Sequence, residues 1–304
     1  MPWSKRRVLV AGAGGMLGSY LVPALEGAGA RVTAVDIADA DLRNPRLCDL
    51  LVRHHDVVFN LAATIRGIAY SLEHNGDMLV DNVMASLPLL QAAAHHSVSR
   101  YVAFSSSCIY PEDAPIPIPL LPTMTGVPLS GYGWSKRVLE LAADYYAREQ
   151  GLNVLVVRPF NMYGATYRWV ATDDANVIPA LVSRVLEGED PVVVWGSGQQ
   201  RRAFLHGRDA AALVMLLADN PAAHLVNLGY ETDTSMAELI EIICEVAGRR
   251  PRIVFDRTRP EGPARKAADA TLLRSLTGGY EPRVSLREGI AEMVAAYGTR
   301  RRAA

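Results

Sequence analysis

The chain has few cysteines. Cys48, Cys108 and Cys244 are the three cysteines among 304 residues, and they lie far apart. This spacing offers neither a disulfide framework nor a CxxC metal-binding motif, so the sequence predicts a reduced, cytoplasmic setting and no metal. No apolar run reaches the roughly 20 residues of a membrane-spanning helix, and the start MPWSKRR lacks the apolar core of a signal peptide. We therefore expect no membrane partner.

The sequence also lacks a surplus of either charge. Lys and Arg number 31 against 32 Asp and Glu, and the pI is about 6.7. A balanced charge excludes a global field that would attract nucleic acid or an anionic membrane. The last residues, 299–304, contain three consecutive arginines, and we expect them to form a solvated, disordered basic tail.

A glycine-rich turn near the N-terminus predicts dinucleotide binding. Gly12, Gly15 and Gly18 follow the apolar run 7–11 and precede a helix-like stretch. Glycines at this spacing permit a tight turn, close approach of a pyrophosphate and packing of the helix on the strand. A second strand-like run ends at Asp36, where a carboxylate can hold a ribose 2′-hydroxyl and repel a 2′-phosphate. The pattern therefore favours NAD over NADP.

The rest of the chain continues this alternation of strand-like and helical patterns. The later strand candidates are residues 57–62, 101–105, 154–158 and 225–228. We expect an α/β fold, a Rossmann-like doubly wound parallel sheet with a smaller C-terminal α/β part. After residue 164 the alternation becomes irregular. The expected division is therefore an NAD-binding domain (1–164 with 224–229) and a substrate-binding part (165–223 and 230–298).

Two long amphipathic helices are expected at 77–96 and 133–150, each rich in Ala and Leu on one face. Such a face packs against the sheet or forms a contact between two copies of the chain. Both alternatives are open at this point.

Two segments about 25 residues apart carry reactive groups (SSSCIYP, 105–111, and YGWSK, 132–136). Tyr132 and Lys136 are four residues apart on a predicted helix, so they share one face. A neighbouring ammonium favours an ionised phenol, which can then act as a base. Cys108 adds a thiol whose thiolate can remove a proton, although a small buried cysteine is the plainer interpretation. The set suits oxidation of a sugar hydroxyl followed by chemistry beside the new ketone.

With these motifs the chain resembles the extended short-chain dehydrogenases/reductases over nearly its whole length. Within them it is most similar to the nucleotide-sugar epimerase/dehydratase branch that contains GDP-fucose synthase and GDP-mannose 3,5-epimerase. The stretches that carry the resemblance are residues 12–19, 60–63, 105–111, 132–136, 158–164, 192–198, 202–206 and 254–266.

The resemblance implies roles for individual residues. Ser106 would orient the sugar hydroxyl beside Tyr132, Lys136 would bind the nicotinamide ribose, and Cys108 would occupy the position of the proton-abstracting base. The implied cofactor-binding residues are Gly12, Gly15, Met16, Gly18, Asp36, Leu61, Ala62, Ala63, Tyr132 and Lys136. The implied substrate-binding residues are Asn161, Asn176, Val177, Arg184, Trp195, Arg202 and Arg265. For the diphosphate, Arg265 and Lys266 are weaker candidates than Arg184 and Arg202. A homodimer is also implied.

The chain departs from this branch at two places. GDP-fucose synthase carries an arginine where this chain has Gly14, which with Asp36 argues against a reductase fed by NADPH. The 3,5-epimerases place a histidine or lysine acid where this chain has Asn176, and an amide has no usable acidic proton. Asp173 and Asp174 are nearby candidates for a proton donor.

The sequence thus predicts an NAD-dependent nucleotide-sugar epimerase that acts through a 4-keto intermediate, with a cysteine base at carbon 3 or 5 and a GDP-sugar favoured. Epimerisation at carbon 4 alone, dehydration, and reduction of a keto sugar are alternatives. An NAD-binding regulatory protein without turnover is a further alternative, because function depends on sites rather than folds.

Overall fold

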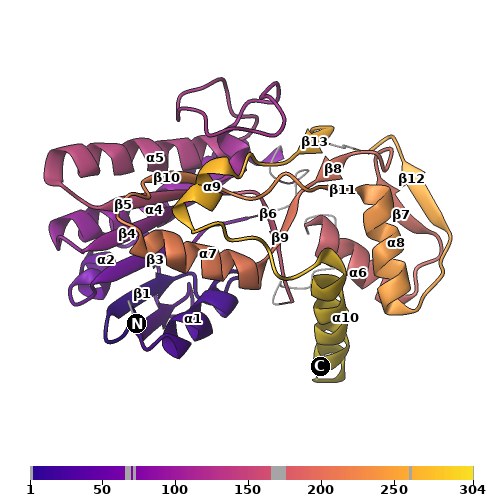
Figure 1. Ribbon diagram of the computed structural model, residues 1–304, viewed down its shortest axis with the longest axis horizontal. Coiled ribbons are helices and arrows are strands. Elements are labelled where there is room, and N and C mark those ends of the chain that lie inside the picture. Colours follow the sequence, from indigo (N-terminus) through magenta and orange to yellow (C-terminus); the bar gives the residue numbers. More distant parts are fainter. Residues whose placement is uncertain (1–2, 66–69, 71–72, 166–175, 260–261, 304) are drawn as a thin grey trace.

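The computed structural model describes residues 3–65, 70, 73–165, 176–259 and 262–303, with only the backbone from residue 299 on. Figure 1 shows a large sheet with its helices on the left and a smaller α/β part on the right. No helix of the described residues is both long and apolar enough to cross a membrane.

The large sheet has six strands in the order β10-β5-β4-β3-β1-β2, and every neighbouring pair is parallel. The strands are β1 (Arg7–Ala11), β2 (Arg31–Val35), β3 (Val57–Asn60), β4 (Arg100–Phe104), β5 (Val154–Pro159) and β10 (Leu225–Leu228). The chain order reverses between β1 and β3, and in open α/β sheets such a switch point, at the carboxyl ends of the strands, is where ligands bind. The predicted fold class is confirmed.

Helices cover both faces of this sheet (Figure 1). The helices are α1 (Gly18–Gly27) and α7 (Gly207–Asp219) on one face, and α2 (Pro45–Val52), α4 (Asn75–His95) and α5 (Gly131–Gln150) on the other. Residues of β1 alternate between the two hydrophobic clusters, with Val8 and Val10 facing α1 and Leu9 and Ala11 facing the opposite layer. Burial on both sides explains why the strands are continuous apolar runs.

The smaller part has its own hydrophobic cluster. Its helices are α6 (Val177–Glu187), α8 (Met236–Ala247) and α10 (Leu286–Ala303), and a short helix, α9 (Thr271–Leu276), lies against the large sheet instead. Its strands are β6 (Asn161–Tyr163), β7 (Val192–Trp195), β8 (Arg201–Arg202), β9 (Phe204–His206), β11 (Thr234–Ser235), β12 (Ile253–Asp256) and β13 (Arg265–Lys266). They form three small sheets, ordered β11-β8-β13, β12-β7 and β6-β9.

Two features of the C-terminal half differ from expectation. Helix α7 lies within 165–223, yet its apolar stripe, which includes Leu213 and Leu217, is buried with α1 against the large sheet. The basic tail, expected to be disordered, continues α10 to Ala303, in keeping with the good helix propensity of Ala and Arg. The division into an NAD-binding and a substrate-binding part stays a prediction.

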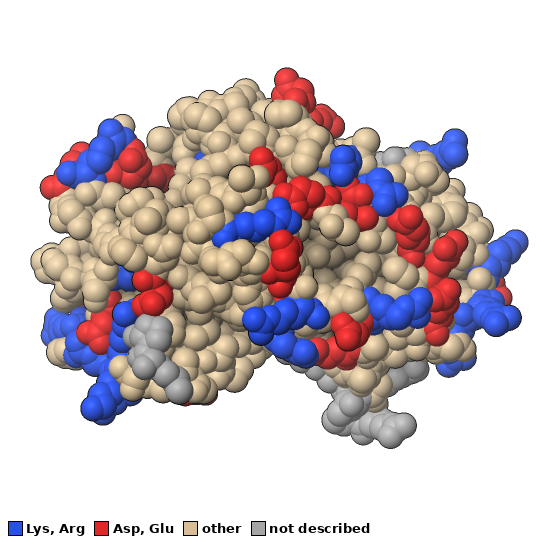
Figure 2. Space-filling model, in the orientation of Figure 1, with Lys and Arg blue, Asp and Glu red and all other residues tan. Residues whose placement is uncertain are grey.

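The surface agrees with the balanced composition. On the face drawn in Figure 2, Lys and Arg side chains are interspersed with Asp and Glu, and neither sign covers a large continuous area.

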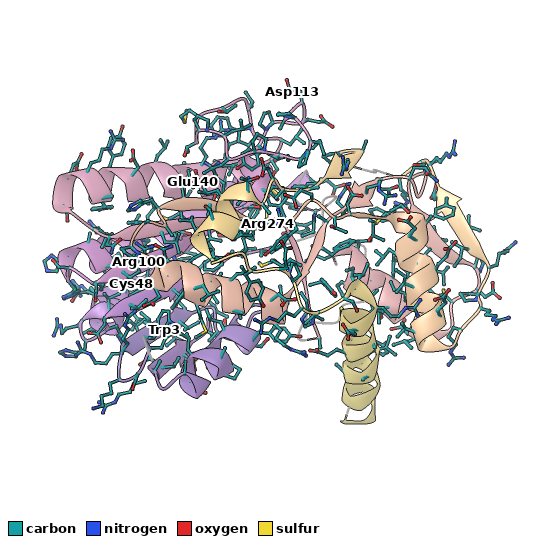
Figure 3. All side chains as sticks on the ribbon, viewed as in Figure 1. Trp3, Cys48, Arg100, Asp113, Glu140 and Arg274 are labelled. Atoms are coloured by element: carbon teal, nitrogen blue, oxygen red, sulfur yellow. The ribbon has the colours of Figure 1, made fainter. Side chains whose placement is uncertain are left out.

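A buried ion pair joins α5 to the sheet. Arg158, on β5, donates from Nε and Nη2 to the carboxylate of Glu140 at 2.8 and 2.6 Å, and the two side chains are 0% and 2% exposed. Figure 3 labels Glu140 on α5. Arg158 also donates to the hydroxyl of Tyr110 at 2.8 Å and to the carbonyl of Leu121 at 2.6 Å. The same guanidinium therefore fixes α5 and the proline-rich loop 111–128.

Glu140→Gln should lower the free energy of unfolding by about 3–5 kcal/mol, because it leaves a buried guanidinium without its counter-charge. Asp144→Asn on the same helix is the matched control. Asp144 pairs with Arg148 at the surface, where both side chains are more than half exposed, so the expected loss is under about 1 kcal/mol. Urea unfolding of both variants measures the difference. Equal losses would contradict the importance of the buried pair.

Candidate active site

The glycine turn lies where the sheet order reverses. Gly12 follows β1 with φ +80°, and a Cβ there would lie 2.8 Å from the backbone nitrogen of Ala62. A side chain at residue 12 would therefore separate the turn from Leu61 and Ala62, which follow β3. The turn leads into α1, whose N-terminus has no side-chain cap. This cradle of backbone at a helix N-terminus fits a pyrophosphate.

The side chain of Asp36 lies beside this glycine turn. Its Oδ1 accepts a hydrogen bond from the backbone of Ile37 at 2.7 Å. A Cβ on Gly14 would lie 2.2 Å from Asp36 Oδ2, so the glycine leaves room for the carboxylate. This arrangement fits the ribose of NAD and opposes a 2′-phosphate.

The loop after β3 is fixed by a residue that the sequence reasoning missed. Asn82 of α4 accepts from the backbone of Thr64 at 3.0 Å and donates to the Thr64 carbonyl at 3.1 Å. The predicted cofactor residues Leu61, Ala62 and Ala63 directly precede this clamp. A buried Asn inside a helix carries no sequence signal for such a partner 18 residues away.

A short turn after β4 presents the cysteine. Ser106 Oγ accepts from the backbone nitrogen of Cys108 at 3.1 Å and so begins the 3₁₀ turn η1 (Ser107–Ile109). Ser106 is 7% exposed, whereas Cys108 remains partly accessible. The sequence SSSC thus forms a cap that fixes the direction of the thiol.

The first turn of α5 packs closely on η1. The helix begins at the N-cap Ser130, and the side chain of Asn75 accepts from the backbone of Gly131 at 2.6 Å. A Cβ on Gly133 would lie 2.4 Å from the carbonyl oxygen of Cys108. The glycine in YGWSK therefore allows Tyr132 and Lys136 to approach Cys108, as the paired motifs predicted.

Burial has the largest effect on the pKa values of Tyr132 and Lys136, the two predicted catalytic residues of α5. Lys136 is 2% exposed, and its Nζ lies 5.5 Å from the centroid of the Tyr132 ring. Burial, and then the charge of Cys108, raise the pKa of Tyr132, while a hydrogen bond with Ser106 lowers it. Burial lowers the pKa of Lys136 to about 8, although Cys108 opposes this shift. The expectation that Lys136 brings down the pKa of the phenol is wrong for this arrangement, because desolvation dominates.

Cys108 differs from the other cysteines. Lys266 Nζ donates to Cys108 Sγ at 3.7 Å. Burial raises the pKa of Cys108, but the charges of Lys266 and Lys136 and hydrogen bonds with Ser106 and Lys266 outweigh it, so the pKa lies below its ordinary value. Burial instead raises the pKa of Cys48 to about 11 and also raises that of Cys244. Cys108 is thus the thiol of this chain suited to act as a base.

The paired strands β8 and β13 divide their basic side chains between two faces. The register places Arg202 beside Lys266 and Arg201 beside Arg265, and successive side chains of a strand point to opposite faces. Arg201 and Arg265 both donate to the carboxylate of Asp233. Of these two weaker candidates from sequence, Lys266 therefore faces the cysteine, while the guanidinium of Arg265 is bound to Asp233.

The remaining predicted substrate residues are spread over the smaller part. Arg184 donates to the carbonyl of Val193 at 2.7 Å, Asn161 donates to that of Ala203 at 3.0 Å, and Arg202 donates to that of Pro263 at 2.7 Å. The guanidinium of Arg259 lies 5.3 Å from the ring centroid of Trp195. Asn176 and Val177 begin α6, both partly or largely exposed. Their substrate contacts stay predictions, and Asp173 and Asp174 lie outside the described residues.

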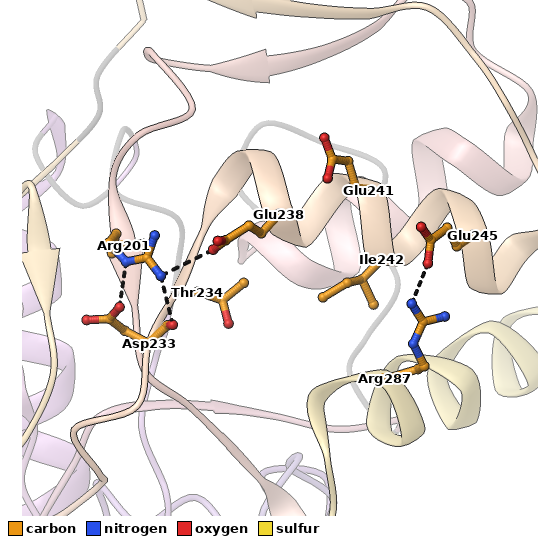
Figure 4. A pocket seen from close by; sticks show the side chains of 8 residues that line it. All are labelled: Arg201, Asp233, Thr234, Glu238, Glu241, Ile242, Glu245 and Arg287. Carbon is orange, nitrogen blue, oxygen red and sulfur yellow. Dashed lines mark hydrogen bonds and ion pairs between the residues drawn. The ribbon is translucent and has the colours of Figure 1, made fainter.

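A separate hollow of about 360 Å³ lies on α8 and α10 (Figure 4). It is lined by Arg201, Asp233, Thr234, Glu238, Glu241, Ile242, Glu245 and Arg287. Its arginines pair with its acids: Arg201 with Asp233 and Glu238, and Arg287 with Glu245. None of its residues is a predicted catalytic or cofactor residue, so it is distinct from the site at Cys108.

Asp36→Asn should shift cofactor preference from NAD toward NADP. Loss of a charged hydrogen bond of about 1.5–3 kcal/mol corresponds to a change of about tenfold or more in the ratio of the two Kd values. Calorimetric titration with each dinucleotide measures this ratio. Asp39→Asn is the control, since Asp39 keeps an oxygen for the Asp36 backbone nitrogen, 2.9 Å away. An unchanged ratio in Asp36→Asn would overturn the assignment.

The chain is similar in sequence to known proteins. The model of the NAD dependent epimerase/dehydratase family matches residues 8–229. The chain is 32% identical over 312 residues to the GDP-L-fucose synthase of Escherichia coli K12, with 95% of each chain covered. It is 28% identical over 308 residues to GDP-mannose 3,5-epimerase 1 of Oryza sativa subsp. indica, covering 95% of this chain and 81% of the relative.

A solved structure is similar over nearly the whole chain. The UDP-glucose 4-epimerase of Thermotoga maritima, determined with UDP-glucose, superimposes with a TM-score of 0.84 at 25% identity, covering 97% of this chain and 99% of that one. The resemblance inferred from the motifs is confirmed. Because the family model matches well over half of its length, the chain belongs to the NAD dependent epimerase/dehydratase family, and it is an NAD-dependent enzyme of the extended short-chain dehydrogenase/reductase type.

Proposed function

We propose that this enzyme epimerises a nucleotide sugar through a 4-keto intermediate, with Cys108 as the base at carbon 3 or carbon 5. The observation that carries the proposal is the surroundings of Cys108. Its sulfur lies 3.7 Å from Lys266 Nζ, and positive charge and hydrogen bonds hold its pKa below the ordinary value despite burial. A thiol that served only to fill space would not need such surroundings.

The first stage is oxidation at carbon 4, in which Tyr132 and Lys136 of α5 act. NAD, when bound, supplies the reversible oxidation of the sugar at carbon 4. Tyr132 accepts the proton of the 4-hydroxyl, which Ser106 orients, and the buried Lys136 lies beside the phenol. Because burial raises the pKa of Tyr132, its phenolate is a strong base for this proton, and the phenol that results returns the proton to the 4-oxygen at the end of the cycle.

The second stage is proton removal next to the ketone, in which Cys108 acts as the base. A ketone at carbon 4 acidifies the hydrogens on carbons 3 and 5. The thiolate of Cys108 removes one of them, and a proton that returns to the opposite face of the ring inverts that centre. Reduction back at carbon 4 then gives an epimer with no net redox change.

The donor of the returning proton differs from that of the 3,5-epimerases. Asn176, at the N-cap of α6, is exposed and makes no side-chain cap hydrogen bond, and its amide cannot supply a proton. We propose that inversion is limited to one carbon, with water or another group as the donor.

A GDP-sugar is the favoured substrate. The relatives named GDP-L-fucose synthase and GDP-mannose 3,5-epimerase support guanine, whereas the similar 4-epimerase structure contains UDP-glucose. We propose that Trp195 contacts the base and that Arg184 and Arg202 contact the diphosphate, because guanidinium groups suit phosphate. Arg265 is not part of this set, because its guanidinium is bound to Asp233.

Inversion at carbon 4 alone is the main alternative, since the similar solved structure is a 4-epimerase. In that reaction Cys108 would take no part. Dehydration or reduction of a keto sugar, and binding of NAD without turnover, would also leave the cysteine without this role.

The proposal is tested in heavy water. The enzyme with NAD is incubated with GDP-mannose and related GDP-sugars, and NMR reads deuterium at each ring carbon. We expect deuterium at carbon 3 or 5 with wild type and at least a 100-fold slower uptake with Cys108→Ala, in line with the loss of a general base. Cys244→Ala is the matched control and should exchange at the wild-type rate. Inversion at carbon 4 without deuterium uptake would establish the 4-epimerase alternative.

We further propose that the enzyme is a cytoplasmic homodimer that pairs through α4 and α5. Val80 and Met84, one turn apart on α4, are 57% and 45% exposed, and Tyr145 on α5 is 55% exposed. Sedimentation should show a dimer in wild type and a weakened dimer in Met84→Glu, because a charge in an apolar contact is costly. A monomeric wild type would contradict this pairing.

A further inference from the structure

We propose that Lys266 is the positioning residue that keeps Cys108 as a thiolate, so that the smaller part of the molecule supplies the charge that activates a base carried by the large sheet. The inference rests on the proposed role of Cys108 and assigns its activation. The two residues are 158 positions apart in the sequence and meet at 3.7 Å between Nζ and Sγ.

The titratable groups that face the thiol come from two sides. Lys136 and Tyr132 belong to α5, and Lys266 belongs to β13. In the free protein the raised pKa of Tyr132 favours the neutral phenol, so the two lysines are the cations of this group. Each favours the thiolate over the thiol.

Burial makes the ammonium of Lys136 a stronger acid. The side chain of Lys136 is buried, and burial brings its pKa to about 8. It therefore begins to lose its charge in the pH range where Cys108 has to be ionised. Lys266 is only partly buried and keeps contact with water, and its charge is the largest of the influences that favour the thiolate.

The backbone around Lys266 is fixed on both sides. Its carbonyl accepts from the backbone of Ala203 at 3.0 Å, next to β8. The carbonyl of the following residue, Ala267, accepts from Ile118 of the loop 111–128 at 2.8 Å. A flexible lysine side chain is thus attached to a strand whose position is set by both parts of the molecule. Its neighbour Arg265 faces away and pairs with Asp233.

The test is the pH profile of Cys108 alkylation in the full-length protein. Iodoacetamide reacts with the thiolate, and mass spectrometry of the peptides reads Cys108 separately from Cys48 and Cys244, whose pKa values are raised. We expect Lys266→Met to move the midpoint upward by about 1–3 pH units relative to wild type, the effect of removing an opposite charge at this distance. Lys266→Arg should retain a low midpoint.

Arg265→Met is the matched control. It removes a positive charge from the adjacent residue, but that charge is directed to Asp233, so the midpoint of Cys108 in the free protein should stay at the wild-type value. Circular dichroism verifies folding of each variant, and Lys266→Gln replaces Lys266→Met if the latter does not fold.

The outcomes separate this inference from the proposed function. A wild-type midpoint in Lys266→Met or Lys266→Gln overturns the inference, and so does an equal upward shift in Arg265→Met. In either case loss of deuterium exchange in Cys108→Ala would still uphold the base. If the midpoint moves as expected but Cys108→Ala exchanges as fast as wild type, Lys266 tunes the thiol and the proposed function fails.

Discussion

The buried pair between Arg158 and Glu140 is the interaction on which the rest of the site depends. It fixes α5 against β5, and α5 carries Tyr132 and Lys136. The same guanidinium binds the loop 111–128 through the carbonyl of Leu121, and that loop in turn pairs with the backbone that follows Lys266. One charged contact in the core therefore orders groups from both parts of the molecule. A pair so fully desolvated contributes geometry more than net stability.

The chemistry depends on how desolvation shifts the pKa values of three neighbouring groups, Tyr132, Lys136 and Cys108. Desolvation makes the phenol of Tyr132 a weaker acid and the ammonium of Lys136 a stronger one. For Cys108 the same desolvation is outweighed by the cations beside it. The result is a site in which ionisation of the Cys108 thiol is favoured, as proton removal beside a ketone requires, and in which the phenolate of Tyr132 is a strong base for the proton of the 4-hydroxyl.

Much of the frame could be predicted from the sequence because it depends on local patterns. The strands at 7–11, 31–35 and 225–228 match at both ends, and Gly12 and Asp36 lie as the fingerprint indicated. The contact of Lys266 with Cys108 could not be predicted, since it joins a two-residue strand to a turn 158 positions away. The expected direction of the Tyr132 pKa was wrong for a related reason: sequence spacing shows that Lys136 is near, but not that desolvation outweighs its charge. The position of helix α7 likewise differs from the expected one, because its apolar stripe does not indicate which sheet it packs against.

The most direct test of the account follows carbon 4 and its neighbours in the same variant. Cys108→Ala is mixed with NAD and with GDP-mannose that carries deuterium on carbons 3 and 5, while absorbance at 340 nm and release of the label to water are recorded. The account predicts that absorbance still rises, because Tyr132 and Lys136 are intact, and that the label stays on the sugar, whereas wild type releases it. Release of the label by Cys108→Ala at the wild-type rate would contradict the assignment of Cys108 as the base.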